Sequence, residues 1–133
     1  WEGGGAYSDL VWCDGGRENA GKCVTDWADQ AVERGAGEIL LTSIDQEGTQ
    51  KGFDCPVVMQ VSKLVTVPVI ASGGMGEAKH AVSAFHSGAS AIAMAHCLHY
   101  DTVPLHETRK FLQEVGFPGR DPEYQRAMPG YIG

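Results

Sequence analysis

The sequence has few cysteines, and no two of them stand at short spacing. The four that it contains are scattered along the chain: Cys13, Cys23, Cys55 and Cys97. Structural zinc sites and disulfide frameworks depend on closely spaced cysteines, so neither is expected here. We therefore expect free thiols in a reducing compartment, the cytoplasm, and neither a bound metal nor a cofactor.

The sequence also has little positive charge and no long apolar run. Against 10 lysines and arginines stand 17 aspartates and glutamates, which gives a formal net charge of −7. Nucleic acid is not an expected partner, because no basic patch offsets this charge. Neither a membrane-spanning segment nor a signal peptide is recognisable, so no membrane is expected either. A phosphorylated small molecule is still compatible, since backbone amides bind phosphate without lysine or arginine.

The chain also lacks an initiating methionine, because its 133 residues begin at Trp1. This start predicts that the chain is a piece of a longer protein. Its length suits one modest domain. Its 18 glycines suit a fold that is built from many short strand–loop–helix units.

What the chain does contain is an alternation of short apolar strands and amphipathic helices. After a strand over residues 7–12 and a turn at Asp14-Gly15-Gly16, we expect a polar loop over 17–21. Apolar residues at helical spacing then predict helices, with Asp54 and Thr102 as N-caps of two of them and Val115 turned inward in the last. The helices are expected over 24–32, 55–65, 78–85 and 103–115, and further strands over 39–41, 67–71 and 91–95.

The later strands are apolar throughout, which is typical of parallel strands that are buried on both faces. A helix–glycine–strand unit also recurs, because Gly35-Ala36 and Gly88-Ala89 stand in the same relation to helix and strand. The order is β-α-β-α-β-α-β-α with an incomplete first strand, and four such units are half of a (β/α)8 TIM barrel. We expect residues 1–133 to form one half-barrel, with an extended tail over about 117–133.

The loop after the strand at 39–41 is a candidate functional rim. It carries Asp45, Glu47, Gly48 and Thr49. A single loop carboxylate is usually solvated or caps a helix. Two carboxylates followed by Gly-Thr, directly after a buried strand, favour chemistry instead, because barrels of this kind place their active sites on these loops.

The other strand ends offer an anion site and two histidines. Ser72-Gly73-Gly74 can bring backbone amides to a phosphate, although Gly-Gly is also a common turn. His96 and His99 follow the strand at 91–95, and no third metal ligand is placed near them, which favours polar rim and packing roles over metal binding. The other histidines fall on helix surfaces or ends: His80, His86 and His106.

These motifs together resemble the cyclase subunit of imidazole glycerol phosphate synthase. The matching segments are residues 35–45 (GAGEILLTSID) with Gly48-Thr49 and Gly52-Phe53-Asp54, residues 68–76 (PVIASGGMG), and Leu98-His99-Tyr100. The segment 15–19 with Asp26-Trp27 resembles the loop and helix between the family's fifth and sixth strands. The resemblance covers about residues 1–115, and the combination is far more specific than a lone glycine pattern.

The resemblance implies the C-terminal half of a (β/α)8 barrel that receives ammonia from a glutaminase subunit. The family joins ammonia to a phosphorylated ribulosyl substrate and forms imidazole glycerol phosphate and aminoimidazole carboxamide ribonucleotide in histidine biosynthesis. Glu47 stands in the place of a catalytic aspartate, with Asp45 as the other candidate acid. Glu38 corresponds to a charged residue where ammonia enters the barrel. The phosphate-binding positions are Gly48, Thr49, Gly73, Gly74, Ala95 and His96.

Three departures from the family pattern shape the expectations. Glu47 is one methylene longer than aspartate, and His96 replaces a small hydroxyl residue. The first four strands and the other catalytic aspartate are absent, so the isolated fragment is expected to be inactive and to pair with the missing N-terminal half or with itself. Two alternatives are a related subunit that amidinates a sugar for surface polysaccharide, and a non-catalytic half-barrel that binds phosphate.

Overall fold

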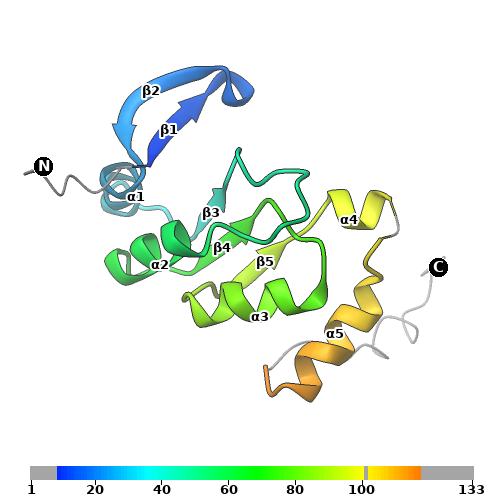
Figure 1. The fold of residues 1–133 in the computed structure, drawn as a ribbon. Coiled ribbons are helices and arrows are strands. Elements are labelled where there is room, and N and C mark those ends of the chain that lie inside the picture. Colours follow the sequence, from blue (N-terminus) through cyan, green and yellow to red (C-terminus); the bar gives the residue numbers. More distant parts are fainter. Residues whose placement is uncertain (1–8, 101, 118–133) are drawn as a thin grey trace, which may run out of the picture.

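The computed structural model describes residues 9–100 and 102–117. The start of the strand expected at 7–12 and nearly all of the tail expected at 117–133 lie outside the described residues. An N-terminal hairpin is followed by alternating helices and strands (Figure 1). In chain order the elements are β1 (Leu10–Cys13), the 3-10 turn η1 (Asp14–Gly16), β2 (Glu18–Cys23), α1 (Val24–Glu33), β3 (Ile39–Thr42), α2 (Cys55–Leu64), β4 (Val69–Ser72), α3 (Ala78–His86), β5 (Ala91–Ala93), α4 (His96–His99) and α5 (Leu105–Glu114).

The N-terminal strands form an antiparallel hairpin of their own. β1 pairs with β2, and Cys13 lies opposite Glu18. The turn between them has left-handed backbone, with φ of 48° at Asp14, 64° at Gly15 and 83° at Gly16. The polar loop expected over 17–21 was therefore wrong, because β2 occupies most of it. Its polar and glycine residues have no strand pattern, and only the pairing with β1 makes this segment a strand.

The three later strands form a parallel sheet in which β4 lies between β3 and β5. In this register Leu41 pairs with Ala71, and Ala71 pairs with Ile92. Each crossover passes through a helix, α2 between β3 and β4 and α3 between β4 and β5. This confirms the predicted fold class: the sheet is part of a (β/α)8 barrel, which is not closed within the described residues.

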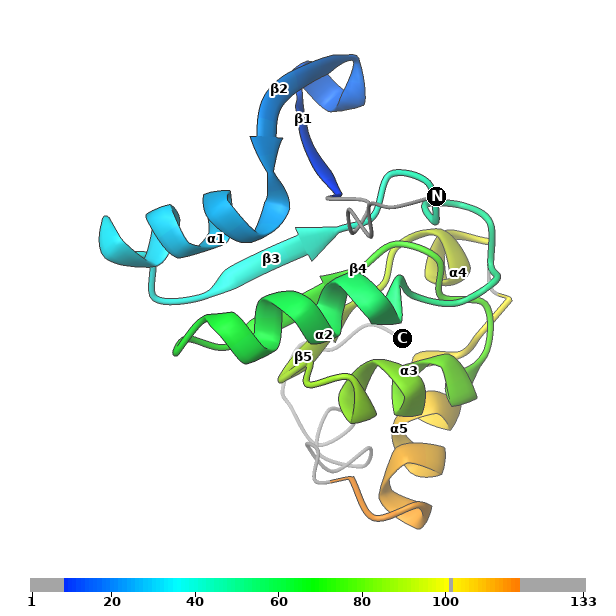
Figure 2. The ribbon, with the colours of Figure 1, turned by 60° about the vertical axis from the view of Figure 1, so that its left-hand side comes forward.

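Helices α1, α2 and α3 pack on one side of this sheet (Figure 2). Val61 of α2 and Val69 of β4 are almost completely buried, and Ala28 of α1, Ile39 and Leu41 pack into the same cluster. A second cluster continues towards β5 and α5 and consists of Phe53, Val58, Ala71, Met75, Ala81, Ala84, Ala89, Cys97 and Val103. Burial of these apolar side chains stabilises the half-barrel by removing them from water.

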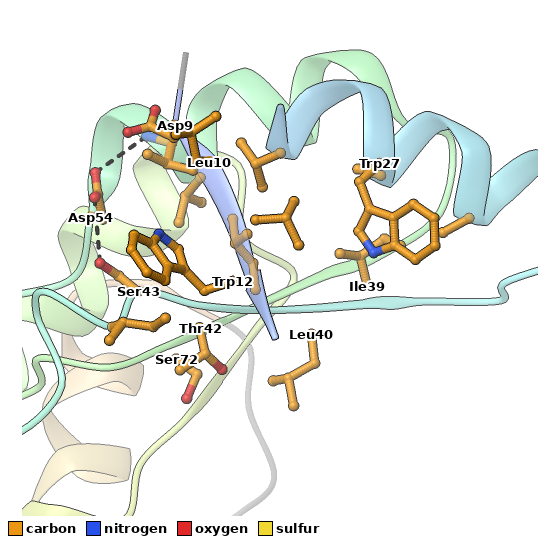
Figure 3. Close-up of a pocket in the computed structure, with 18 of the residues that line it drawn as sticks. Asp9, Leu10, Trp12, Trp27, Ile39, Leu40, Thr42, Ser43, Asp54 and Ser72 are labelled. Atoms are coloured by element: carbon orange, nitrogen blue, oxygen red, sulfur yellow. Dashed lines mark hydrogen bonds between the residues drawn. The ribbon is translucent and has the colours of Figure 1, made fainter. Parts of the chain in front are cut away.

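The other face of β3 is open in the described part of the chain. Leu40 is 61% exposed, and Leu10 and Trp12 of the hairpin are 46% and 47% exposed. All three line a cavity of about 790 Å³ between the hairpin, α1 and β3 (Figure 3). Exposed apolar side chains that gather on one face indicate a surface that another element covers. The cavity is also lined by Ala28 of α1 and Val57 of α2 and runs along β3, the edge strand of the sheet, where a closed barrel would continue with its neighbouring strand.

The N-cap of α2 follows its sequence signal. The Val57 amide donates to Asp54 Oδ1 at 3.4 Å, which confirms Asp54 as the cap. Asp54 Oδ2 also accepts a hydrogen bond from Ser43 Oγ at 3.5 Å (Figure 3). This one carboxylate therefore ties the start of α2 to the loop that follows β3.

The start of α5 departs from its sequence signal. Pro104 stands at the N-cap position without a side-chain cap, and the Thr102 hydroxyl instead donates to the Cys97 carbonyl at 3.2 Å. The prediction of Thr102 as the cap was therefore wrong. Val115 is 46% exposed, so its predicted inward position was also wrong, and Thr108 is buried at 2% exposure. The helix begins later than Thr102 suggested, at Leu105, and ends at Glu114, so Val115 stands outside it.

The loops after β3 and β4 pack backbone against backbone. The Gly52 amide donates to the Gly74 carbonyl at 2.7 Å. A Cβ at Gly74 would collide with the Gly52 carbonyl oxygen, and one at Gly73 would lie 2.7 Å from the Ser43 carbonyl oxygen. Gly73 and Gly74 also have φ of 92° and 95°, a region that favours glycine. No other residue type allows this approach.

We expect Gly73→Ala to lower the free energy of unfolding by about 1–3 kcal/mol, because the new Cβ meets both steric conflict and backbone strain. Urea unfolding followed by circular dichroism measures the change. Gly37→Ala is the control, since Gly37 has no neighbour within 4 Å of a built Cβ and no positive φ. Equal stability of the two variants would contradict the close loop packing.

We expect the 133-residue chain to sediment as dimers or larger species at low micromolar concentration, because the apolar face around Leu40 is open. Leu40→Lys should shift the distribution towards smaller species. Met59→Lys should not, since Met59 is also exposed, at 40%, but lies on α2 away from that face. A wild-type chain that sediments only as a compact monomer would refute this expectation.

Candidate functional site

A small cavity lies where β4 and β5 end, and it contains most of the predicted site residues. Its volume is about 100 Å³. The predicted residues that line it are Glu47, Gly48, Gly73, Gly74, Ala95 and His96. They come from three separate loops, so the fold brings together residues that lie far apart in the sequence. We call this cavity the glycine pocket.

Glu47 reaches the glycine pocket from the loop after β3. Its Oε2 lies 3.3 Å from the position of a Cβ built on Gly73. The Glu47 amide donates to the Ser43 carbonyl at 3.1 Å, which holds the start of this loop in a tight turn. The carboxylate is exposed and stands beside the pocket.

Thr49 is the predicted phosphate ligand that does not line the pocket. Its hydroxyl donates to the Gln46 carbonyl at 2.8 Å, and the Lys51 amide donates to Thr49 Oγ1 at 3.2 Å. Both bonds stay within the loop. Thr49 therefore shapes the turn that carries Glu47 and Gly48, and its hydroxyl is occupied there.

Backbone amides around the pocket are free to bind a ligand. Within residues 9–100 and 102–117, the amides of Gly48, Gly74 and Ala95 donate no hydrogen bond. Glycines in left-handed conformations leave their amides accessible, and clusters of such amides form concave anion sites. No lysine or arginine of the described residues lines the pocket, so any anion would be held mainly by the backbone.

His96 adds the only basic side chain of the described residues that line the pocket. Its Nδ1 lies 4.0 Å from a Cβ built on Gly48, and its ring packs against Tyr100 with centroids 4.6 Å apart. The ring of His99 also contacts Tyr100, at 4.9 Å. No group of three metal-ligating side chains is present among the described residues. Both histidines therefore pack against Tyr100.

Sequence reasoning missed Cys97 and Met75, which line the same pocket. Both are buried, at 1% and 4% exposure. Burial raises the pKa of the Cys97 thiol, and the nearby charge of Glu47 adds to this, while backbone hydrogen bonds to the sulfur act in the opposite direction. Cys97 therefore stays a neutral thiol, a packing residue of the pocket floor. No sequence signal marks it, because an isolated cysteine is usually structural.

The two candidate acids face different cavities. Glu47 lines the glycine pocket, whereas Asp45 and Glu38 line the larger cavity between the hairpin and β3. Glu38 stands before the first residue of β3 and Asp45 stands after its last, so they lie at opposite ends of the strand. Ser72, at the end of β4, lines both cavities. It marks the boundary between them.

Among the described residues, no helix is both long and apolar enough to span a membrane.

Comparison with known proteins gives consistent matches. The family model described as "Histidine biosynthesis protein" matches residues 4–104. The HisF subunit of imidazole glycerol phosphate synthase from Streptococcus sanguinis (strain SK36) is 45% identical over 111 residues, 83% of this chain and 44% of the relative. The HisF subunit from Bacillus pumilus (strain SAFR-032) is 49% identical over 108 residues, 80% and 43% of the two chains. That from Thermococcus onnurineus (strain NA1) is 44% identical over 110 residues, 83% and 44%.

The chain thus spans less than half the length of these curated relatives. The family model nevertheless covers most of the chain, including the hairpin, the parallel sheet and the whole glycine pocket. The chain therefore belongs to the histidine biosynthesis protein family.

Proposed function

We propose that this chain forms the C-terminal half of the cyclase barrel of imidazole glycerol phosphate synthase and binds one phosphate group of the phosphorylated ribulosyl substrate. One observation carries the proposal: the glycine pocket gathers Gly48, Gly73, Gly74, Ala95 and His96 around about 100 Å³. A small pocket that offers free amides and an imidazole suits a tetrahedral anion. The relatives' name, imidazole glycerol phosphate synthase, supports a phosphorylated ligand, and the ribulosyl substrate follows from the family resemblance.

The same geometry supports Glu47 as the acid–base group of this half-site. A group that transfers a proton must come within hydrogen-bond reach of the substrate. A substrate that is anchored by its phosphate in the glycine pocket would meet Glu47 first, because this carboxylate lines the pocket and Asp45 does not. Asp45 is the second candidate, since a substrate that extends into the larger cavity would approach it.

Glu38 suits a role at the opposite end of the half-barrel. It precedes β3 and is exposed, at the strand end away from the glycine pocket. Ammonia from a glutaminase subunit would enter here and travel through the barrel towards the strand ends that carry the chemistry. The relatives are named as subunits, which supports a partner protein for this chain.

The half-barrel needs a second half to close. We propose that residues 1–133 form a half-barrel domain of four βα units and that an N-terminal half covers the open face around Leu40. A second copy of this chain is the alternative cover. The chain spans 44% of the relative from Streptococcus sanguinis, and the proposed N-terminal half would bring the other catalytic acid. The isolated chain is therefore expected to bind phosphate without catalysing the reaction.

The reaction on the histidine pathway is the preferred assignment. A subunit that amidinates a sugar for surface polysaccharide would share the fold and the ammonia source and would differ in the acceptor. The HisF names of the relatives favour the histidine pathway over that acceptor. A half-barrel that only binds phosphate would share the pocket but would not need the carboxylate of Glu47, so a substitution there separates the two.

We expect Ala95→Leu to weaken the binding of inorganic phosphate by about tenfold or more, because the larger side chain occupies the small pocket. Ala95 is exposed, so this change spares the core, whereas a side chain at Gly73 would disturb the loop packing itself. Titration followed by amide chemical shifts of Gly48 and Gly74 measures the affinity.

The matched control is Ala20→Leu, on the exposed hairpin strand β2, which should bind phosphate like the wild type. An unchanged affinity in Ala95→Leu would place the phosphate elsewhere. Urea unfolding of both variants shows whether either change affects the fold.

We expect Glu47→Gln, in a protein in which the N-terminal half is supplied, to lower turnover by roughly a hundredfold or more. Substrate affinity should stay equal or rise, since the change removes a negative charge beside the bound phosphate. Steady-state cyclase assays with added ammonia separate kcat from KM. Asp45→Asn is the matched control. Normal turnover in Glu47→Gln together with an inactive Asp45→Asn would assign the acid to Asp45.

A further inference from the structure

We propose that His80 is a positioning residue of the glycine pocket: its imidazole holds the loop after β4 in the conformation that the pocket requires. The part of this inference that concerns ligand binding rests on the proposed phosphate function, whereas the part that concerns the loop does not. His80 lies on the first turn of α3, outside the lining of the pocket, and would act through Gly76 and Gly74.

Both ring nitrogens of His80 have partners. The Gly76 amide donates to His80 Nδ1 at 3.2 Å. On the other side of the ring, Nε2 lies 3.1 Å from Glu77 Oε1, to which it donates. These two contacts require the tautomer with its proton on Nε2. The His80 side chain is only 14% exposed, whereas that of Glu77 is 47% exposed, so the imidazole is buried and its carboxylate partner lies at the surface.

This arrangement replaces the usual cap of the helix. Glu77 is the N-cap residue of α3, but its side chain accepts no hydrogen bond from the first amides of the helix. Its carboxylate instead contacts His80 and also Lys79, at 2.7 Å. His80, at the third helical position, accepts from the amide of Gly76, one residue before the N-cap amide that a glutamate at this position accepts from in a capping box. The helix start and the glycine loop are therefore joined through one imidazole.

The ring also contacts the neighbouring loop. A Cβ built on Gly52 would lie 3.5 Å from His80 Cδ2, so the imidazole lies over this glycine. The Gly52 amide in turn donates to the Gly74 carbonyl at 2.7 Å, and a Cβ on Gly76 would collide with the Gln50 carbonyl oxygen. His80 thus touches both loops at the point where their backbones meet.

From this point the chain of contacts leads directly to the pocket. Gly74 lines the pocket. A Cβ built on its neighbour Gly73 would lie 3.3 Å from Glu47 Oε2. These backbones interlock with no side chain between them, so a shift at Gly76 or Gly52 displaces the pocket wall. Small displacements of a preorganised wall lower the affinity for a ligand and misplace the catalytic group.

Two variants of His80 separate its hydrogen bond from its packing. His80→Phe keeps a ring over Gly52 and removes the acceptor for the Gly76 amide. His80→Asn loses the ring but keeps an oxygen near the position of Nδ1. If His80 positions the loop, Asn should rescue what Phe loses; if it only fills space, the order should be reversed. His106→Phe is the matched control, on a histidine whose side chain is 65% exposed.

Two measurements on the full chain read the result. Amide hydrogen exchange at Gly76 and Gly52 should be roughly three- to tenfold faster in His80→Phe, as expected for the loss of one hydrogen bond. The dissociation constant for inorganic phosphate should rise by a similar factor. His80→Asn and His106→Phe should stay within about twofold of the wild type in both. The Val65 amide, bonded to Val61 in α2, serves as the internal reference.

The following outcomes test the positioning role and the phosphate function separately. Wild-type exchange in His80→Phe, a failure of His80→Asn to rescue, or equal acceleration at Val65 and Gly76 would overturn the positioning role. If the wild-type chain binds no phosphate while the exchange pattern holds, the proposed phosphate function fails and the positioning of the loop stands. If the exchange pattern holds but His80→Phe binds phosphate normally, the loop does not control the pocket.

Discussion

The hydrogen bond between the Gly52 amide and the Gly74 carbonyl is the contact on which the site depends. It joins the loops that follow β3 and β4 with no side chain between them. Such an approach is possible only because Gly74 has no Cβ and a left-handed backbone. The parallel register of the two strands brings the loops to the same edge of the sheet, and the glycines then let them interlock. The part of the pocket wall at Gly73 and Gly74 is therefore made of main chain.

A pocket built in this way would let an acidic chain bind the proposed phosphate. With a net charge of −7 the long-range field opposes an anionic ligand. Free backbone amides act at short range, and their positions are set by the fold rather than by flexible cationic side chains. The negative charge of an ionised Glu47 beside this pocket would oppose a bound phosphate. The proposed acid–base role gives its position a reason.

The surface around Leu40 is apolar, in contrast to the polar glycine pocket. Leu40, Leu10 and Trp12 leave a broad apolar surface towards the larger cavity, whereas the helices already bury the other side. In a (β/α)8 barrel the inward-facing side chains fill a packed core. The half-barrel therefore carries the inner wall of such a core, and Asp45 and Glu38 stand at its two ends.

The sequence by itself determined the alternation of elements, the parallel sheet and most of the pocket. Continuous apolar strands and glycines at their ends are local signals, so the sequence alone predicts the strand at 39–41 and the turn at Gly73 and Gly74. Only the tertiary structure decided what depends on a distant partner. β2 is a strand because β1 pairs with it, and Thr108 is buried on α5 although it is polar. The side chains of Thr49 and His80 take partners that their spacing does not encode, because loop packing selects them.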